Sequence, residues 1–378
     1  IFFCHIINQT IFPVSAMPTF SLCMIVKNEE KVLGRCLESA KRLADEIVIV
    51  DTGSEDRTKE IARQYTSRVY EIPWRDDFSQ ARNFSFSKAE REYCMWLDAD
   101  DVISEENLER MLEYKERMDG TEDVVMVKYA VGFGEDGRPS LTYCRERILK
   151  NREDLRWSGR VHEAVTPAGK VVYWDAAVFH RKEGRGEPGR NLRIYERMRA
   201  EGEEFGPRDL FYYGRELMYA GQIEVGARVL REFLGREDGW EENKIQACGD
   251  LAACLGKLGR EEESLRALLL SFQWGRPRAE ICCGIGEYFL RRRDWRTAAY
   301  WYEEALAAGR EENLWGFVRE EYREYIPHMQ LCVCLDRLGE REKAYGHHLL
   351  AKSLRPEAAE VRYNEEYFRK VLGNREEG

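Results

Sequence analysis

The sequence lacks the features that would place it in a membrane or on nucleic acid. It has no apolar run long enough to form a membrane-spanning helix, and its net charge of −10 leaves no basic excess for phosphate binding. Its eleven cysteines lack zinc-type spacing and lie mostly in apolar runs, which indicates reduced core residues of a cytoplasmic protein. With 43% hydrophobic and 34% charged residues, the 378-residue chain is typical of a globular protein of two or three domains.

Residues 1–16 also lack what a targeting segment needs. They are apolar, but they are too short to span a bilayer and have no basic start. We therefore interpret them as an extension outside the fold, which we expect to begin at Met17.

Strand-like and helix-like segments alternate over the first hundred residues. We predict strands at 20–26, 46–50, 69–72 and 93–98, with helices at 31–41, 56–65 and 78–89 between them. This alternation predicts a Rossmann-like α/β domain with a mostly parallel sheet, in which the strand ends carry functional residues. No glycine follows the first strand before Gly34, so we do not expect the glycine-rich phosphate loop of a nicotinamide enzyme.

Three carboxylates, Asp98, Asp100 and Asp101, follow the apolar run 93–97 and have no obvious partner in the neighbouring sequence. A helix with an acidic first turn is expected to begin after Ser104, so the carboxylates lie in a strand-to-helix loop. An Asp-x-Asp there suits Mg²⁺ or Mn²⁺, which take oxygen ligands and share them with substrate phosphates. The structural alternative is an acidic turn in which Asp101 helps to cap the helix.

Four short motifs cover roughly the first half of the chain: residues 25–30 (IVKNEE), 48–54 (VIVDTGS) with Asp56 and Thr58, 78–83 (FSQARN) and 96–101 (WLDADD). In this order they resemble the family 2 glycosyltransferases with the GT-A fold. The resemblance implies a hexosyltransferase that uses a nucleoside diphosphate sugar, such as a UDP-sugar, together with Mg²⁺ or Mn²⁺.

The resemblance also implies which residues bind the donor. Asp51 would accept hydrogen bonds from the nucleotide base or ribose, in a pocket completed by the backbone of Val26, Asn28 and Glu29. Asp98 would lie near the ribose and the donor sugar.

Two further donor-side roles follow from the resemblance. Asp100 would ligate the cation that bridges the two phosphates, and His180, at the end of the apolar run 174–179, could add a nitrogen ligand. Arg82 would face the phosphates or the sugar. The structural alternatives are a solvated helix arginine for Arg82 and a hydrogen-bonded strand-end histidine for His180.

Residues 124–180 are interpreted as the acceptor half, with strands at 124–131, 143–149 and 171–180 and a hairpin turn at 134–137. An inverting transferase needs a carboxylate to take the acceptor proton, and Glu163 is the candidate by position. His162 and Glu163 would point to opposite sides if they lie on a strand, and a surface glutamate beside Arg160 is the alternative reading of Glu163. The glycine-rich segment 182–190 has the composition of a lid.

Residues after 191 show an internal repeat. Similar segments begin at Gly221, Gly259, Arg293 and Gly339, which lie 38, 34 and 46 residues apart, and an amphipathic helix follows each. They resemble irregular tetratricopeptide-like helical hairpins. A stack of such hairpins presents a concave surface for a peptide or protein, although a packing or homodimerisation role is equally open.

These interpretations give three segments: the extension 1–16, a GT-A domain at 17–190 and an all-α repeat domain at 191–378. We expect a metal-dependent, inverting glycosyltransferase with a peptide or protein acceptor, because the combination resembles enzymes that glycosylate peptides, including bacteriocin precursors. Transfer to a cell-wall or capsular saccharide is the alternative reaction. A non-catalytic peptide-binding scaffold is the alternative without activity.

Overall fold

The structure is a computed structural model that describes residues 17–134, 137, 139–183, 187–309 and 318–373. Contacts divide the chain into two compact units. The first holds the residues up to Lys128, Arg145–Ser158 and Glu163–Glu183, and the second holds Tyr129–Cys144, Gly159–His162 and the residues from Gly184 onward.

Some sequence predictions fall outside the described residues. These are the extension 1–16, residues 135–136 of the hairpin turn and residues 184–186 of the lid. The domain boundary at residue 190 stays a prediction.

The first unit follows the predicted alternation of strands and helices. The elements of this part of the chain are β1 (Phe20–Val26), α1 (Leu33–Ala40), β2 (Glu46–Asp51), α2 (Thr58–Tyr65), β3 (Val69–Glu71), α3 (Phe78–Phe86), β4 (Tyr93–Trp96), β5 (Asp101–Val102), α4 (Glu105–Arg117), β6 (Val124–Phe133), β7 (Pro139–Lys150) and β8 (Val171–His180). Residues 129–133 of β6 and 139–144 of β7 belong to the second unit. The strand order is β3-β2-β1-β4-β7-β6-β8-β5, and β9 (Val318–Arg319) pairs with β7. The pairs among β1 to β4 are parallel, whereas β4–β7 and β5–β8 are antiparallel.

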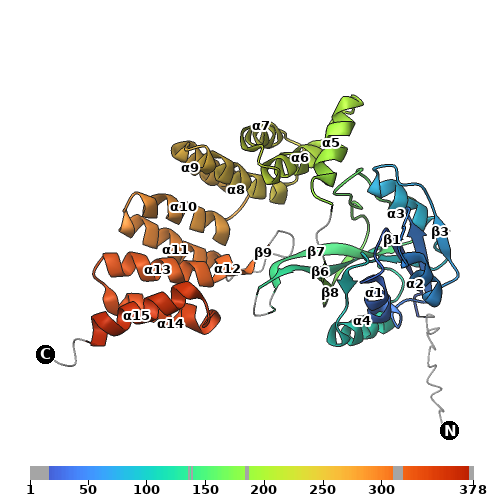
Figure 1. Ribbon diagram of the computed structural model, residues 1–378, viewed down its shortest axis with the longest axis horizontal. Coiled ribbons are helices and arrows are strands. Elements are labelled where there is room, and N and C mark those ends of the chain that lie inside the picture. The colour runs from blue at the N-terminus through green and yellow to red at the C-terminus, as the bar shows by residue number, and fades with distance from the viewer. Residues whose placement is uncertain (1–16, 135–136, 138, 184–186, 310–317, 374–378) are drawn as a thin grey trace, which may run out of the picture. The chain divides into compact units, whose positions relative to one another are not determined.

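The chain order reverses between β1 and β4. Strands β2 and β3 lie on one side of β1 and β4 lies on the other. Figure 1 labels β1 and β3 of this sheet. Six of the seven β1 residues are buried, as expected for a strand covered on both faces. Ligands of open α/β sheets bind at the carboxyl ends of the strands at such a reversal. Asn28 and Asp98 follow β1 and β4, and Asp51 is the last residue of β2, so this sheet edge carries all three.

The second unit is mostly helical. Its helices are α5 (Arg190–Ala200), α6 (Pro207–Tyr219), α7 (Ile223–Leu234), α8 (Glu241–Lys257), α9 (Glu261–Leu270), the 3-10 turn Ser271–Gln273, α10 (Ala279–Arg291), α11 (Trp295–Gly309), α12 (Glu320–Arg323), α13 (Tyr325–Arg337), α14 (Arg341–Leu354) and α15 (Ala359–Gly373). Four pairs pack as hairpins: α6 with α7, α8 with α9, α10 with α11, and α13 with α14. Neighbouring hairpins also contact each other, through α7 and α8, α9 and α10, and α11 and α13. Among the described residues, no helix has the length and apolarity needed to cross a membrane.

The four predicted repeat starts are the turns inside these hairpins. Gly221, Gly259, Arg293 and Gly339 all have a left-handed backbone, with φ of 80°, 72°, 60° and 84°. In each turn, the N–H of the following residue donates to the carbonyl five residues earlier, as from Arg260 to Leu255 (2.9 Å). This is the Schellman bond that closes a helix end, and it prefers glycine at the left-handed position. Only the third repeat places a side chain there.

The shared turn gives a prediction about stability. Gly259→Ala should lower the free energy of unfolding by about 1–2 kcal/mol, because an L-residue is strained in this conformation and the new Cβ gains no contact within 4 Å. Arg293→Gly should leave stability unchanged or raise it slightly, because relief of strain opposes the added unfolded-state entropy. Urea denaturation measures both variants. Gly256→Ala, within α8 and also in open space, is the matched control and should not destabilise the protein. Equal effects at positions 256 and 259 would contradict the account.

Candidate functional site

The end of β2 presents a buried carboxylate. Asp51 is 1% exposed, and its Oδ1 accepts hydrogen bonds from the N–H groups of Gly53 (2.9 Å) and Ser54 (2.8 Å). Its Oδ2 has no hydrogen-bond partner among the described residues. The Thr52 N–H donates to the carbonyl of Val26 at 3.0 Å, which joins the ends of β1 and β2. Because an unpaired buried oxygen is costly, Asp51 is suited to accept a hydrogen bond from a ligand.

The loop after β1 is held by the loop after β2. Asn28 has a left-handed backbone, with φ of 56°. Its N–H donates to Ser54 Oγ (2.9 Å), and its side-chain oxygen accepts from the N–H of Glu55 (2.8 Å). The Glu29 N–H donates to Thr58 Oγ1 at 2.7 Å. The backbone predicted to line the nucleotide pocket is therefore fixed by side chains of the second motif.

Arg82 joins the two carboxylates that were predicted to act on the sugar and on the acceptor. From α3, its Nη2 donates to Asp98 Oδ1 (2.6 Å) and its Nε donates to Glu163 Oε1 (2.7 Å). Burial disfavours a charge on Asp98, but the nearby Arg82 and Arg147 outweigh it and lower the pKa of Asp98 to about 2. Asp98 therefore stays ionised at any ordinary pH.

The Arg82 side chain is 7% exposed, and its guanidinium packs against two indole rings that meet edge to face. The ring centroids of Trp96 and Trp157 are each 4.8 Å from its central carbon. A cation over aromatic faces is stabilised there and has little freedom to turn. The alternative of a solvated helix arginine is therefore wrong. The predicted contact between Arg82 and the donor stays a prediction.

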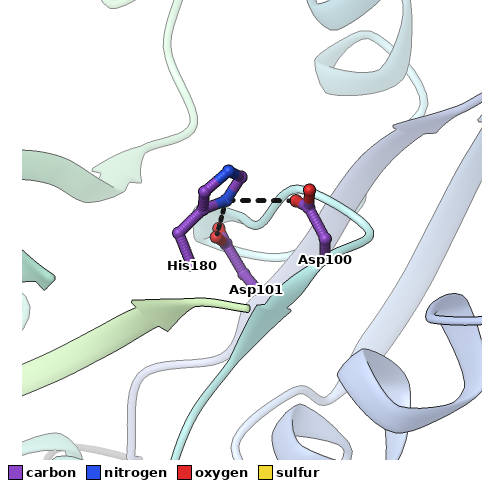
Figure 2. A group of neighbouring side chains, drawn as sticks. All are labelled: Asp100, Asp101 and His180. Carbon is purple, nitrogen blue, oxygen red and sulfur yellow. Dashed lines mark hydrogen bonds and ion pairs between the residues drawn. The ribbon is translucent and has the colours of Figure 1, made fainter. Parts of the chain in front are cut away.

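Asp100, Asp101 and His180 form a cluster of metal-binding type (Figure 2). Asp101 on β5 is the register partner of His180 on β8, which brings the two strand ends together. Nδ1 of His180 lies 3.2 Å from Asp100 Oδ1 and 3.4 Å from Asp101 Oδ1. One ligand atom from each residue lies within 4.8 Å of the others. The structure thus brings together the two predicted metal ligands and adds Asp101.

The charges around this cluster suit a divalent cation. Burial, together with the charges of Asp100 and Asp98, raises the pKa of Glu29 to about 7. Burial alone would lower the pKa of His180, but hydrogen bonds to Asp100 and Asp101 and their charges raise it to about 10. Negative charge at this sheet edge contributes to both shifts. Two carboxylates and one imidazole fit Mn²⁺ or Mg²⁺, whose charge would replace that of the imidazolium proton.

Two of the three loop carboxylates have arginine partners that sequence reasoning missed. Asp98 pairs with Arg82, and Asp101 pairs with Arg147 at 3.0 Å. The alternative in which Asp101 caps the next helix is wrong, because Ser104 caps α4 through its side chain. Arg147 lies in the charged run Arg145–Arg147 of β7, and nothing local in that run distinguishes it as the partner of Asp101.

The segment around Glu163 is a loop, whereas a strand had been considered. Only Ser158 and Ala164 form an isolated bridge there, and His162 has φ of 51°. Nε2 of His162 lies 2.7 Å from Glu216 Oε1, and its ring stacks on Tyr212 in the second unit. Glu163 instead contacts Arg82, so the two side chains have different partners, although not through the alternation of a strand.

The sequence comparisons give a family match and several relatives. The model described as "Glycosyl transferase family 2" matches residues 21–171. A TPR repeat-containing protein of Synechococcus elongatus is 31% identical over 277 residues, covering 68% of this chain and 66% of the relative. The lipopolysaccharide core biosynthesis glycosyltransferase LpsC of Rhizobium meliloti is 32% identical over 170 residues (42% and 60%). The SPbeta prophage-derived glycosyltransferase SunS of Bacillus subtilis is 30% identical over 240 residues (58% and 54%). The chain thus spans between 54% and 66% of these relatives.

Proposed function

Because residues 21–171 belong to glycosyl transferase family 2 and tetratricopeptide-like hairpins follow them, we propose that the protein is a metal-dependent, inverting hexosyltransferase. Its donor is a nucleoside diphosphate sugar. The observation that carries the proposal is the cluster of Asp100, Asp101 and His180 beside the strand-order reversal. A hard cation there would neutralise the charge that develops on the departing diphosphate.

We assign each of these side chains a role in sugar transfer. Asp100 and His180 hold the cation, and Asp98 lies toward the ribose and the donor sugar. Glu163 accepts the proton of the acceptor as it attacks the anomeric carbon from the face opposite the diphosphate. Arg82 bonds to Asp98 and Glu163, which supports a fixed separation between the donor-side and acceptor-side carboxylates.

Asp51 supports a donor whose base carries a ring N–H. Its free Oδ2 is an acceptor, so it suits uracil, whose N3 bears hydrogen, and it does not suit the N3 of cytosine. Guanine and thymine also carry a ring N–H, and among these three bases we propose uracil, and hence a UDP-sugar.

Asp51→Asn gives a prediction about the donor. The variant keeps an acceptor for Gly53 and Ser54 but places an NH₂ group against the base. Losing a charged hydrogen bond should weaken UDP binding roughly 10–100-fold, or about 1.5–3 kcal/mol. Calorimetric titration with UDP measures the loss, and CDP is the control ligand because its affinity should not fall. Equal losses for both nucleotides would assign Asp51 to the ribose.

A peptide or protein is the acceptor that we propose, because stacked helical hairpins offer an extended surface for a polypeptide. A saccharide acceptor is the second candidate, and it is favoured by the lipopolysaccharide role printed in the name of LpsC. Offering radiolabelled UDP-hexoses to the full chain with a host lysate separates the two. Label that protease converts to small fragments supports the first candidate, and label that stays in protease-resistant glycan supports the second.

A further inference from the structure

We propose that Arg147 is a positioning residue of the cation site and that it acts through Asp101. The inference rests on the metal-dependent function proposed above. Arg147 lies on β7, and its side chain is 1% exposed, while that of Asp101 is 0% exposed. Its Nη1 donates to Asp101 Oδ2 (3.0 Å) and to the carbonyl of Trp96 (3.3 Å). Two buried charges at this distance depend strongly on each other.

The Asp101 carboxylate closes the turn that carries Asp100. Its Oδ2 accepts the N–H of Asp98 (3.0 Å), and the Asp101 N–H donates back to the Asp98 carbonyl (3.0 Å). Arg147 binds that same Oδ2, so the orientation of the carboxylate is fixed. The other oxygen, Oδ1, then faces Nδ1 of His180 at 3.4 Å. Arg147 thereby sets the position of both the Asp100 turn and the His180 ring through Asp101.

Arginine suits this task better than lysine. The guanidinium carbon of Arg147 lies 3.9 Å from the centroid of the Trp96 ring, so the planar guanidinium stacks on this ring while it donates its hydrogen bond to Asp101. A lysine would keep the positive charge but lose the planar stack and the fixed donor direction. Arg145, on the same strand, contacts the same ring at 4.9 Å but pairs with Glu146. It provides a matched control, because its ion pair is with a different carboxylate.

Binding of Mn²⁺ to the full-length protein tests the proposal without measuring activity. Electron paramagnetic resonance measures the concentration of unbound Mn²⁺ during a titration. Arg147→Lys should weaken Mn²⁺ binding by roughly 10–100-fold, the usual effect of losing a partner of a metal ligand. Its metal-free affinity for UDP should not change, whereas a general loss of structure would lower both affinities. Arg145→Lys should bind Mn²⁺ as the unaltered protein does.

A second comparison applies if Arg147→Lys does not fold. Asp101→Asn and the double variant Asp101→Asn with Arg147→Met should bind Mn²⁺ equally weakly, because Arg147 has nothing to position once the carboxylate is gone. The double variant also leaves no uncompensated buried charge. Unchanged Mn²⁺ affinity in Arg147→Lys, or a further loss in the double variant, would overturn the role of Arg147 alone. Failure of the unaltered protein to bind Mn²⁺ would overturn the metal-dependent function with it.

Discussion

Asp100→Asn should lower sugar transfer by roughly 10²–10³-fold while the protein stays folded. A bound cation supplies several kcal/mol of charge stabilisation at a departing diphosphate, and each 1.4 kcal/mol is worth about tenfold in rate. Replacing Asp100 should remove this stabilisation without unfolding the protein. Asp101 is less suitable for the test, because it forms a buried ion pair with Arg147. Initial rates of transfer at saturating Mn²⁺ measure the effect, and circular dichroism checks the fold.

The matched control is Asp175→Asn. Asp175 lies on β8, the strand that ends at His180, but it is exposed and pairs with Lys128. Its replacement should leave transfer unchanged, because exposed ion pairs contribute little. Normal turnover from Asp100→Asn, or full activity of the unaltered protein in excess chelator, would exclude the metal role.

Much of the fold follows from local sequence patterns, and these predictions are confirmed. Apolar runs and helical periodicity predicted the strands and helices of the first unit, because each is decided by neighbouring residues. The family and the tetratricopeptide-like repeats are confirmed by the matches to the family model and to the Synechococcus relative. The repeat starts at Gly221 and Gly259 proved to be turns of one geometry. A glycine at a fixed place in each repeat is a local signal of that geometry.

The partners of the site residues could not be predicted in the same way. Arg147 lies 46 positions from Asp101, and Arg82 lies 81 positions from Glu163. These pairs form because β7 joins the sheet beside β4 and because the loop around Glu163 returns to α3, neither of which has a local signature. The short strand β5 was missed for the same reason, since two residues carry no periodicity and only pairing with β8 defines it.

The structure changes what a test of Glu163 must control for. Glu163 is one of the two carboxylates that accept hydrogen bonds from Arg82. A replacement that cannot accept this hydrogen bond would therefore also free Arg82 to move and would disturb Asp98. Glutamine is the suitable replacement, because its side-chain oxygen can still accept the hydrogen bond from Arg82 Nε. The ability to take a proton and the negative charge are then removed, while Arg82 keeps its ion pair with Asp98.

Glu163→Gln should lower the turnover number for a hydroxyl acceptor by roughly 10²–10⁴-fold, with little change in donor affinity, because a general base contributes on that scale. For a thiol acceptor the loss should be smaller and should shrink as the pH rises toward the thiol pKa of about 8.5, where the thiolate forms without a base. Steady-state kinetics across that pH range measure both cases, with the exposed Glu153→Gln as the control. Unchanged turnover on a hydroxyl acceptor would show that another group takes the proton. Weakened UDP-sugar binding would instead place Glu163 in the nucleotide-sugar pocket.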